Sequence, residues 1–96
     1  MNALQTLTAP VGWQDGPPDY QSAKSRSWEL TGPLRAIVCA RTYRGGRVRI
    51  WIGALQGGGA SEVVATVEGG HAQIALEAVC GFALMVINNV QTGEKR

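Results

Sequence analysis

The sequence contains few of the residues from which catalytic and metal sites are built. Its 96 residues include one histidine and two cysteines. The seven acidic residues form no pair at a spacing typical of acid–base catalysis. No Lys, Ser or Thr follows the paired glycines Gly69 and Gly70 at the spacing of a phosphate-binding loop. We therefore expect a non-enzymatic protein that uses neither a metal nor any other cofactor.

The histidine and the cysteines are each expected to be structural. His71 has no Cys, Asp or Ser within a few residues that would make it an acid or base. Cys39 and Cys80 lie inside apolar runs, which indicates buried, reduced thiols. The alternative is a disulfide between them, which requires both side chains to point into one core. Because the N-terminus lacks a basic segment followed by an apolar one, we expect a cytoplasmic protein.

The net charge is low but unevenly distributed. A net charge of +2 is too small to indicate a polyanionic partner by itself. Residues 24–49, however, hold seven Lys and Arg against the single acid Glu29, whereas residues 50–94 hold four acids and neither Lys nor Arg. The apolar run at 78–87 is ten residues long, about half the length of a membrane span, so no membrane-spanning segment is expected.

Gly45 and Gly46 separate two runs rich in β-branched and aromatic residues, which predicts a β-hairpin. A two-residue turn pairs Tyr43 with Val48 and Ala40 with Trp51. In this register Arg41 is a misfit on the apolar face, which we expect to meet the core. That face carries Ile37, Cys39, Tyr43, Val48, Ile50, Ile52 and Ala54, and the opposite face carries Thr42, Arg44, Arg47, Arg49 and Trp51.

The rest of the chain predicts a third strand and then a helix. Residues 61–68 alternate apolar and polar side chains, and residues 71–89 are rich in strong helix formers, which predicts a largely buried helix. The expected class is α+β, a three- to four-stranded antiparallel sheet covered on one face by a C-terminal helix. The alternative is an all-β meander, because glycines recur every 12 residues at Gly45, Gly57, Gly69, Gly81 and Gly93.

We expect one domain preceded by an extended arm. Residues 1–27 are interpreted as arm and linker, because the proline-rich segment 15–19 interrupts regular structure and residues 22–27 are polar. Residues 28–91 form the expected α+β domain, and residues 92–96 form a frayed tail.

Within residues 47–89, one set of residues accompanies the glycine-turn strand pair, namely Ile52, Gly53, Gly58, Glu62, Val63, Gly69, Gly70, Leu76, Glu77 and Ala78. In this layout the segment resembles the TSCPD-type domain of vitamin-B12-dependent ribonucleotide reductases and its small stand-alone relatives. The segment that follows the helix in that family is not matched. The resemblance covers about half of the chain and implies a small α+β accessory domain without catalytic machinery.

Trp51 is the most informative residue for function, because an exposed Trp beside small neighbours often marks a protein contact. We expect an accessory module that acts by self-association or by docking to a protein partner. The alternative is a nucleic-acid-binding accessory protein, in which arginines contact phosphates while the indole stacks on a base. The expected contact residues are Trp51, Arg44, Arg47 and Arg49, with Trp13 and Trp28 as additional contacts.

Overall fold

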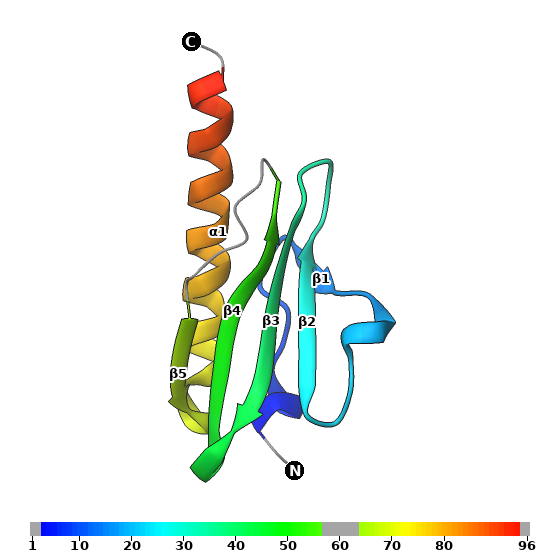
Figure 1. Cartoon of the computed structure of the whole chain (residues 1–96), viewed down its shortest axis with the longest axis vertical. Coiled ribbons are helices and arrows are strands. Elements are labelled where there is room, and N and C mark those ends of the chain that lie inside the picture. The colour runs from blue at the N-terminus through cyan, green and yellow to red at the C-terminus, as the bar shows by residue number, and fades with distance from the viewer. Residues whose placement is uncertain (1–2, 57–63, 95–96) are drawn as a thin grey trace.

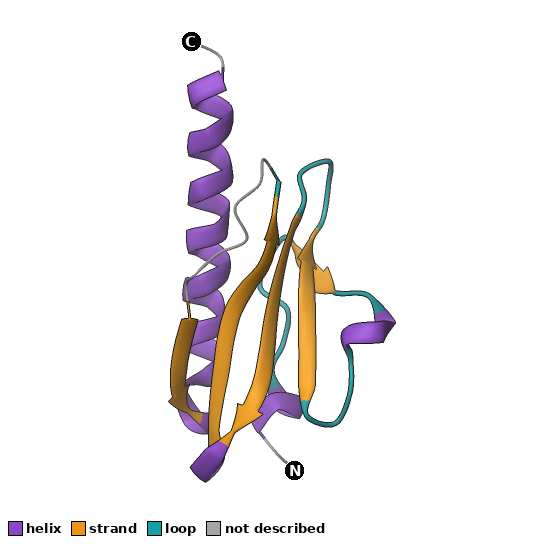
Figure 2. Cartoon of the chain, in the orientation of Figure 1, coloured by secondary structure: helices purple, strands orange, loops and turns teal. Residues whose placement is uncertain are grey.

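The computed structural model describes residues 3–56 and 64–94, which form an antiparallel sheet of five strands with one long helix on one face (Figure 1). The strands lie in chain order across the sheet, β1-β2-β3-β4-β5 (Figure 2). The expected α+β class is confirmed, with five strands in place of three or four. The elements are η1 (Ala3–Thr6), β1 (Trp13–Asp15), η2 (Pro18–Tyr20), β2 (Ser25–Leu30), β3 (Ala36–Tyr43), η3 (Arg44–Gly46), β4 (Arg47–Leu55), β5 (Val64–Glu68), η4 (Gly69–His71) and α1 (Ala72–Glu94).

The chain turns from β5 into α1 at the paired glycines. A Cβ atom on Gly69 would lie only 2.8 Å from the Cβ atom of Ala3 and 3.0 Å from the carbonyl oxygen of Gly46, so a side chain would crowd this turn. After Gly70 the backbone is helical, and the all-β alternative is wrong. The C-terminal part of α1 extends past the end of the sheet (Figure 1).

The N-terminal residues belong to the domain, which corrects the expected arm and linker at 1–27. Strand β2 runs across the expected boundary at Ser27, and Leu4 and Leu7 are buried in the core. Gln73 of α1 fixes this segment, because its amide oxygen accepts from the N–H of Thr8 at 2.9 Å and its Nε2 donates to the carbonyl oxygen of Thr8 at 3.0 Å. The scattered apolar residues of this segment have no periodicity, and only tertiary contacts order them.

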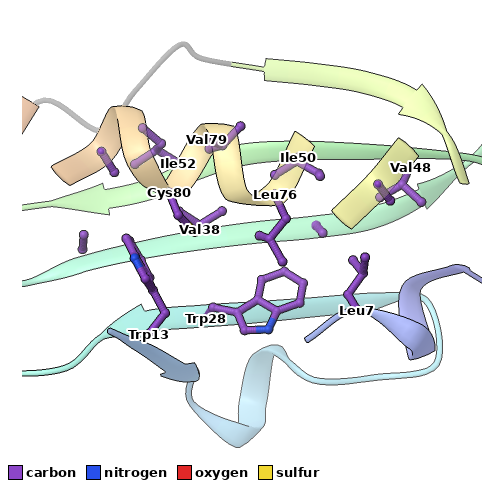
Figure 3. Packing of buried hydrophobic residues seen from close by; sticks show 14 of the residues in the cluster. Leu7, Trp13, Trp28, Val38, Val48, Ile50, Ile52, Leu76, Val79 and Cys80 are labelled. Atoms are coloured by element: carbon purple, nitrogen blue, oxygen red, sulfur yellow. The ribbon is translucent and has the colours of Figure 1, made fainter. Parts of the chain in front are cut away.

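The core lies between the helix and the sheet and includes two of the three tryptophans (Figure 3). Trp28 of β2 is fully buried and Trp13 of β1 is nearly so. Their expected role as additional contact residues is therefore wrong, because a partner cannot reach them in the folded domain. Figure 3 shows them with Leu7, Val38, Val48, Ile50, Ile52, Leu76, Val79 and Cys80.

The hairpin register differs by one residue from the expected one. A three-residue turn, η3, joins β3 to β4, with positive φ angles at Gly45 and Gly46. It pairs Cys39 with Trp51 and Ala40 with Ile50. Strand β4 has the expected faces up to Ile52, whereas β3 is flipped, so that Val38 and Ala40 meet the core. An irregularity in the register between Ile37 and Val38 makes Ala54 the partner of Ile37, so the expected place of Ala54 on the core face is wrong. The side chains of β3 that were assigned to the core, Ile37, Cys39 and Tyr43, lie on the other face, where Arg41 is no misfit.

The helix buries one side only, so it is less buried than expected. Its outer side carries exposed apolar residues, including Ile74, which is 71% exposed, and Met85, which is 51% exposed. By length and composition alone, the stretch Gly69–Asn88 is apolar enough to cross a membrane, although the ten-residue run did not indicate this. The core helices of soluble proteins share that property, and α1 packs on β3, β4 and β5.

The two cysteines are free and lie on opposite faces of the sheet, so the alternative of a disulfide is wrong. Cys80 of α1 lies in the core, where burial, with a contribution from the charge of Glu77, raises its pKa to about 12. Cys39 is half-buried on the face away from α1, and burial raises its pKa too. Neither thiol is activated as a nucleophile at neutral pH.

This arrangement predicts slow modification of Cys80 in the folded protein. In a Cys39→Ala variant at pH 8, alkylation of Cys80 should be at least about a hundredfold slower in buffer than in denaturant, because burial suppresses the thiolate. Since the folded pKa lies above the unfolded value of 9.0, the stability contributed by the neutral thiol is complete below about pH 9 and declines as the pH rises toward 12. Equal alkylation rates in the two conditions would contradict the buried position.

Candidate binding face

The face of the sheet turned away from α1 carries a concentrated set of basic and aromatic side chains. Side chains alternate along a strand, so the residues of β3 and β4 that do not meet the core point to this side. We define the open face by these residues, which are Ile37, Cys39, Arg41, Tyr43, Arg47, Arg49, Trp51, Gly53 and Ala54.

The register arranges the open face in rows. Tyr43 is opposite Arg47 at the hairpin end, Arg41 is opposite Arg49 in the next row, and Cys39 is opposite Trp51 in the row after that. A row of two arginines therefore lies between two rows that each carry an aromatic ring. Like charges directly opposite each other destabilise a strand pair, so this row has an energetic cost in the free protein.

Tyr43 organises the two guanidinium groups nearest to it. The Cζ atom of Arg49 lies 4.3 Å from the centre of the Tyr43 ring, and the Cζ atom of Arg47 lies 5.6 Å from it. The Nε of Arg47 also donates to the carbonyl oxygen of Arg44 at 3.1 Å. These contacts hold Arg47 and Arg49 close to the sheet, which limits the entropy that each would lose on binding a ligand.

The positive charge of this region is not neutralised by ion pairs. Among residues 3–56 and 64–94, the one ion pair joins Arg26 to Asp15 and involves none of the arginines of the open face or its turn. Glu68 of β5 is opposite Arg47 in the register, and Asp19 borders a hollow beside Arg41, but neither forms an ion pair with them. The arginines therefore present their charges to the solvent.

Trp51 lies between two hollows, one lined partly by arginines and the other lined by uncharged residues. One of about 450 Å³ is lined by Arg41, Thr42, Tyr43, Arg49 and Trp51. Another, of about 310 Å³, is lined by Ile37, Cys39, Trp51, Gly53 and Ala54. Both hollows are partly open at the sheet surface, so an extended ligand lying on the sheet can reach them.

The structure brings together most of the contact residues that the sequence predicted. Arg47, Arg49 and Trp51 share the open face, and Arg44 lies in the turn at its end. The sequence reasoning missed Arg41 and Tyr43, because the expected register placed both on the core side. The misfit of Arg41 on an apolar face was the available signal, since a turn of three residues removes it.

Nothing in this region forms an evident catalytic or metal centre. His71 is exposed in η4. Within the described ranges, 3–56 and 64–94, no group of three His, Cys, Asp or Glu side chains is placed to hold a metal ion. The side chains of the open face can form salt links, bidentate hydrogen bonds to anions and stacking contacts.

No protein-family model, curated protein or solved structure matches this chain. The likeness to the TSCPD-type domain therefore stays a prediction. The fold and the open face define a class in physical terms, namely a small α+β domain that presents an arginine-rich, aromatic sheet face.

Proposed function

We propose that this protein is a non-enzymatic binding module that docks an anionic macromolecule on its open face. The observation that carries the proposal is the row of Arg41 and Arg49 between Tyr43 and Trp51, with no ion-pair partner for either arginine among the described residues. An anionic ligand would relieve the repulsion within this row and would be held by planar, always charged guanidinium groups.

The charge of the open face argues against self-association through it. A symmetric dimer places the same patch on both subunits, so two open faces would bring arginines against arginines. The role as an accessory module remains part of the proposal, with an acidic partner in place of a second copy. A face that only kept the sheet soluble would gain nothing from Tyr43 and Trp51, because exposed rings do not improve solubility.

Reversing one charge on the open face should weaken binding to a polyanion. Heparin is a suitable probe because its recognition is dominated by charge. Arg49→Glu should lower the salt concentration that elutes the protein from heparin and weaken binding at low salt by roughly tenfold or more, since a carboxylate would repel the ligand.

Arg35→Glu is the matched control, because it changes the net charge equally at an exposed position between β2 and β3, away from the open face. It should elute close to the parent protein. Thermal unfolding followed by circular dichroism checks that both variants fold. Equal retention of the two variants would contradict a specific role for the open face.

A further inference from the structure

We infer that the anionic partner is a single-stranded nucleic acid, an inference that rests on the proposed function. Charge alone fits any polyanion, but the open face also exposes two rings. The Tyr43 side chain is 41% exposed, and Trp51 is half-buried between the two hollows. Unpaired bases stack on such rings, and this stacking tolerates any base because every base has a π-face.

The spacing of the rings and the charges fits a chain that alternates bases with phosphates. Cys39, the residue opposite Trp51, lies four positions from Tyr43 along β3. The backbone rows that carry the two rings are therefore separated by roughly 13 Å along the strand direction, from the rise per residue of a strand. Arg41 and Arg49 occupy the row between them. A strand crossing this face can place a base on each ring and its phosphates on the arginines between.

The shape of the face favours an unpaired strand over a duplex. The hollows beside Trp51 are partly open and lie on the surface of a sheet. The open face does not project a helix or a β-ribbon that could enter a groove, and paired bases cannot splay out to stack on side chains. An acidic peptide would use the arginines but would gain little from Tyr43, because carboxylates do not stack on rings.

The test compares ligands that share negative charge and differ in bases. Labelled oligothymidylate and oligouridylate of about twenty nucleotides, a DNA duplex of the same length and labelled polyglutamate are titrated with the full chain, with fluorescence anisotropy as the readout. We expect the two single strands to bind most tightly, with affinity that falls steeply as salt is added. Binding of single strands should also change the fluorescence of Trp51.

Removing the rings should weaken binding to single strands more than binding to heparin; some loss of heparin binding is expected for Tyr43→Ala, because Tyr43 also holds Arg47 and Arg49 close to the sheet. Tyr43→Ala and Trp51→Ala should each weaken oligothymidylate binding by about fivefold or more. Phe82→Ala is the matched control, because the Phe82 side chain is 39% exposed and lies on α1, on the other side of the sheet. Trp51→Leu keeps apolar volume without an indole, so it tests stacking if the alanine variant is unstable.

The outcomes separate the inference from the function on which it rests. If duplex or polyglutamate binds as tightly as the single strands, or if the ring variants bind oligothymidylate like the parent, the inference is wrong. In that case the proposed function stands, provided that Arg49→Glu still loses heparin binding. If the parent binds neither heparin nor any oligonucleotide at low salt, both are wrong.

Discussion

Ile50→Asp should unfold the domain. Ile50 is fully buried at the centre of β4, opposite Ala40 of β3 and Ala65 of β5. Removing the aliphatic side chain alone costs about 2–5 kcal/mol, and an unpaired carboxylate in this environment adds several more. The total is comparable to the whole stability of a small domain, about 5–15 kcal/mol. Circular dichroism and tryptophan fluorescence should show loss of the cooperative thermal transition.

Thr66→Asp is the matched control for introducing the charge. Thr66 is exposed on β5, opposite Arg49, so its aspartate remains in water beside a positive charge. This variant should melt within a few degrees of the parent, because exposed substitutions usually change stability by no more than about 0.5 kcal/mol. A parent-like melting temperature for Ile50→Asp would mean that this face of β4 does not meet the core.

Arg26→Ala should also destabilise the domain strongly, although less than Ile50→Asp does. Arg26 of β2 is the main polar link between the sheet and the N-terminal segment. Its Nη1 donates to the carbonyl oxygens of Leu4 at 3.1 Å and Leu7 at 2.7 Å, and its Nη2 donates to Asp15 Oδ1 at 3.1 Å. The Cζ atom also lies 4.9 Å from the centre of the Trp28 ring. Alanine removes these contacts, including the donor to the carbonyl oxygen of Leu7, while the carbonyl oxygen of Leu4 keeps the N–H of Leu7 at 3.4 Å.

We expect the free energy of unfolding to fall by about 2–4 kcal/mol in urea titrations, since hydrogen bonds from a charged donor contribute about 1.5–3 kcal/mol. The ion pair itself contributes little, because the Asp15 side chain is 68% exposed. Arg26→Lys should destabilise the domain almost as much as Arg26→Ala although it keeps the charge, because an ammonium lacks the planar fork of a guanidinium.

Arg35→Ala is the control for loss of an exposed arginine, since the bond that Arg35 makes to Gln56 comes from its backbone N–H and survives the change. This variant should stay within about 0.5 kcal/mol of the parent. A similarly small effect of Arg26→Ala would show that the N-terminal residues are held without this side chain.

The sequence determined the elements whose patterns are unambiguous. The helix after Gly69 and Gly70 was predictable, because a long segment of strong helix formers is poorly suited to a strand. The core face of β4 was also predictable as far as Ile52, because apolar and charged residues alternate from Arg47 to Ile50 and Ile52 continues the apolar positions.

Only the tertiary structure decided which face of β3 is buried and where the N-terminal segment lies. Residues 36–40 are apolar at every position, so either face of β3 could meet the core, and one residue of turn length settles the choice. The segment before β2 has too few apolar residues to form an element of its own, and contacts to Arg26 and Gln73 fix it. The open face follows from the first of these, because the flipped β3 places Arg41 and Tyr43 on the same side of the sheet as Trp51.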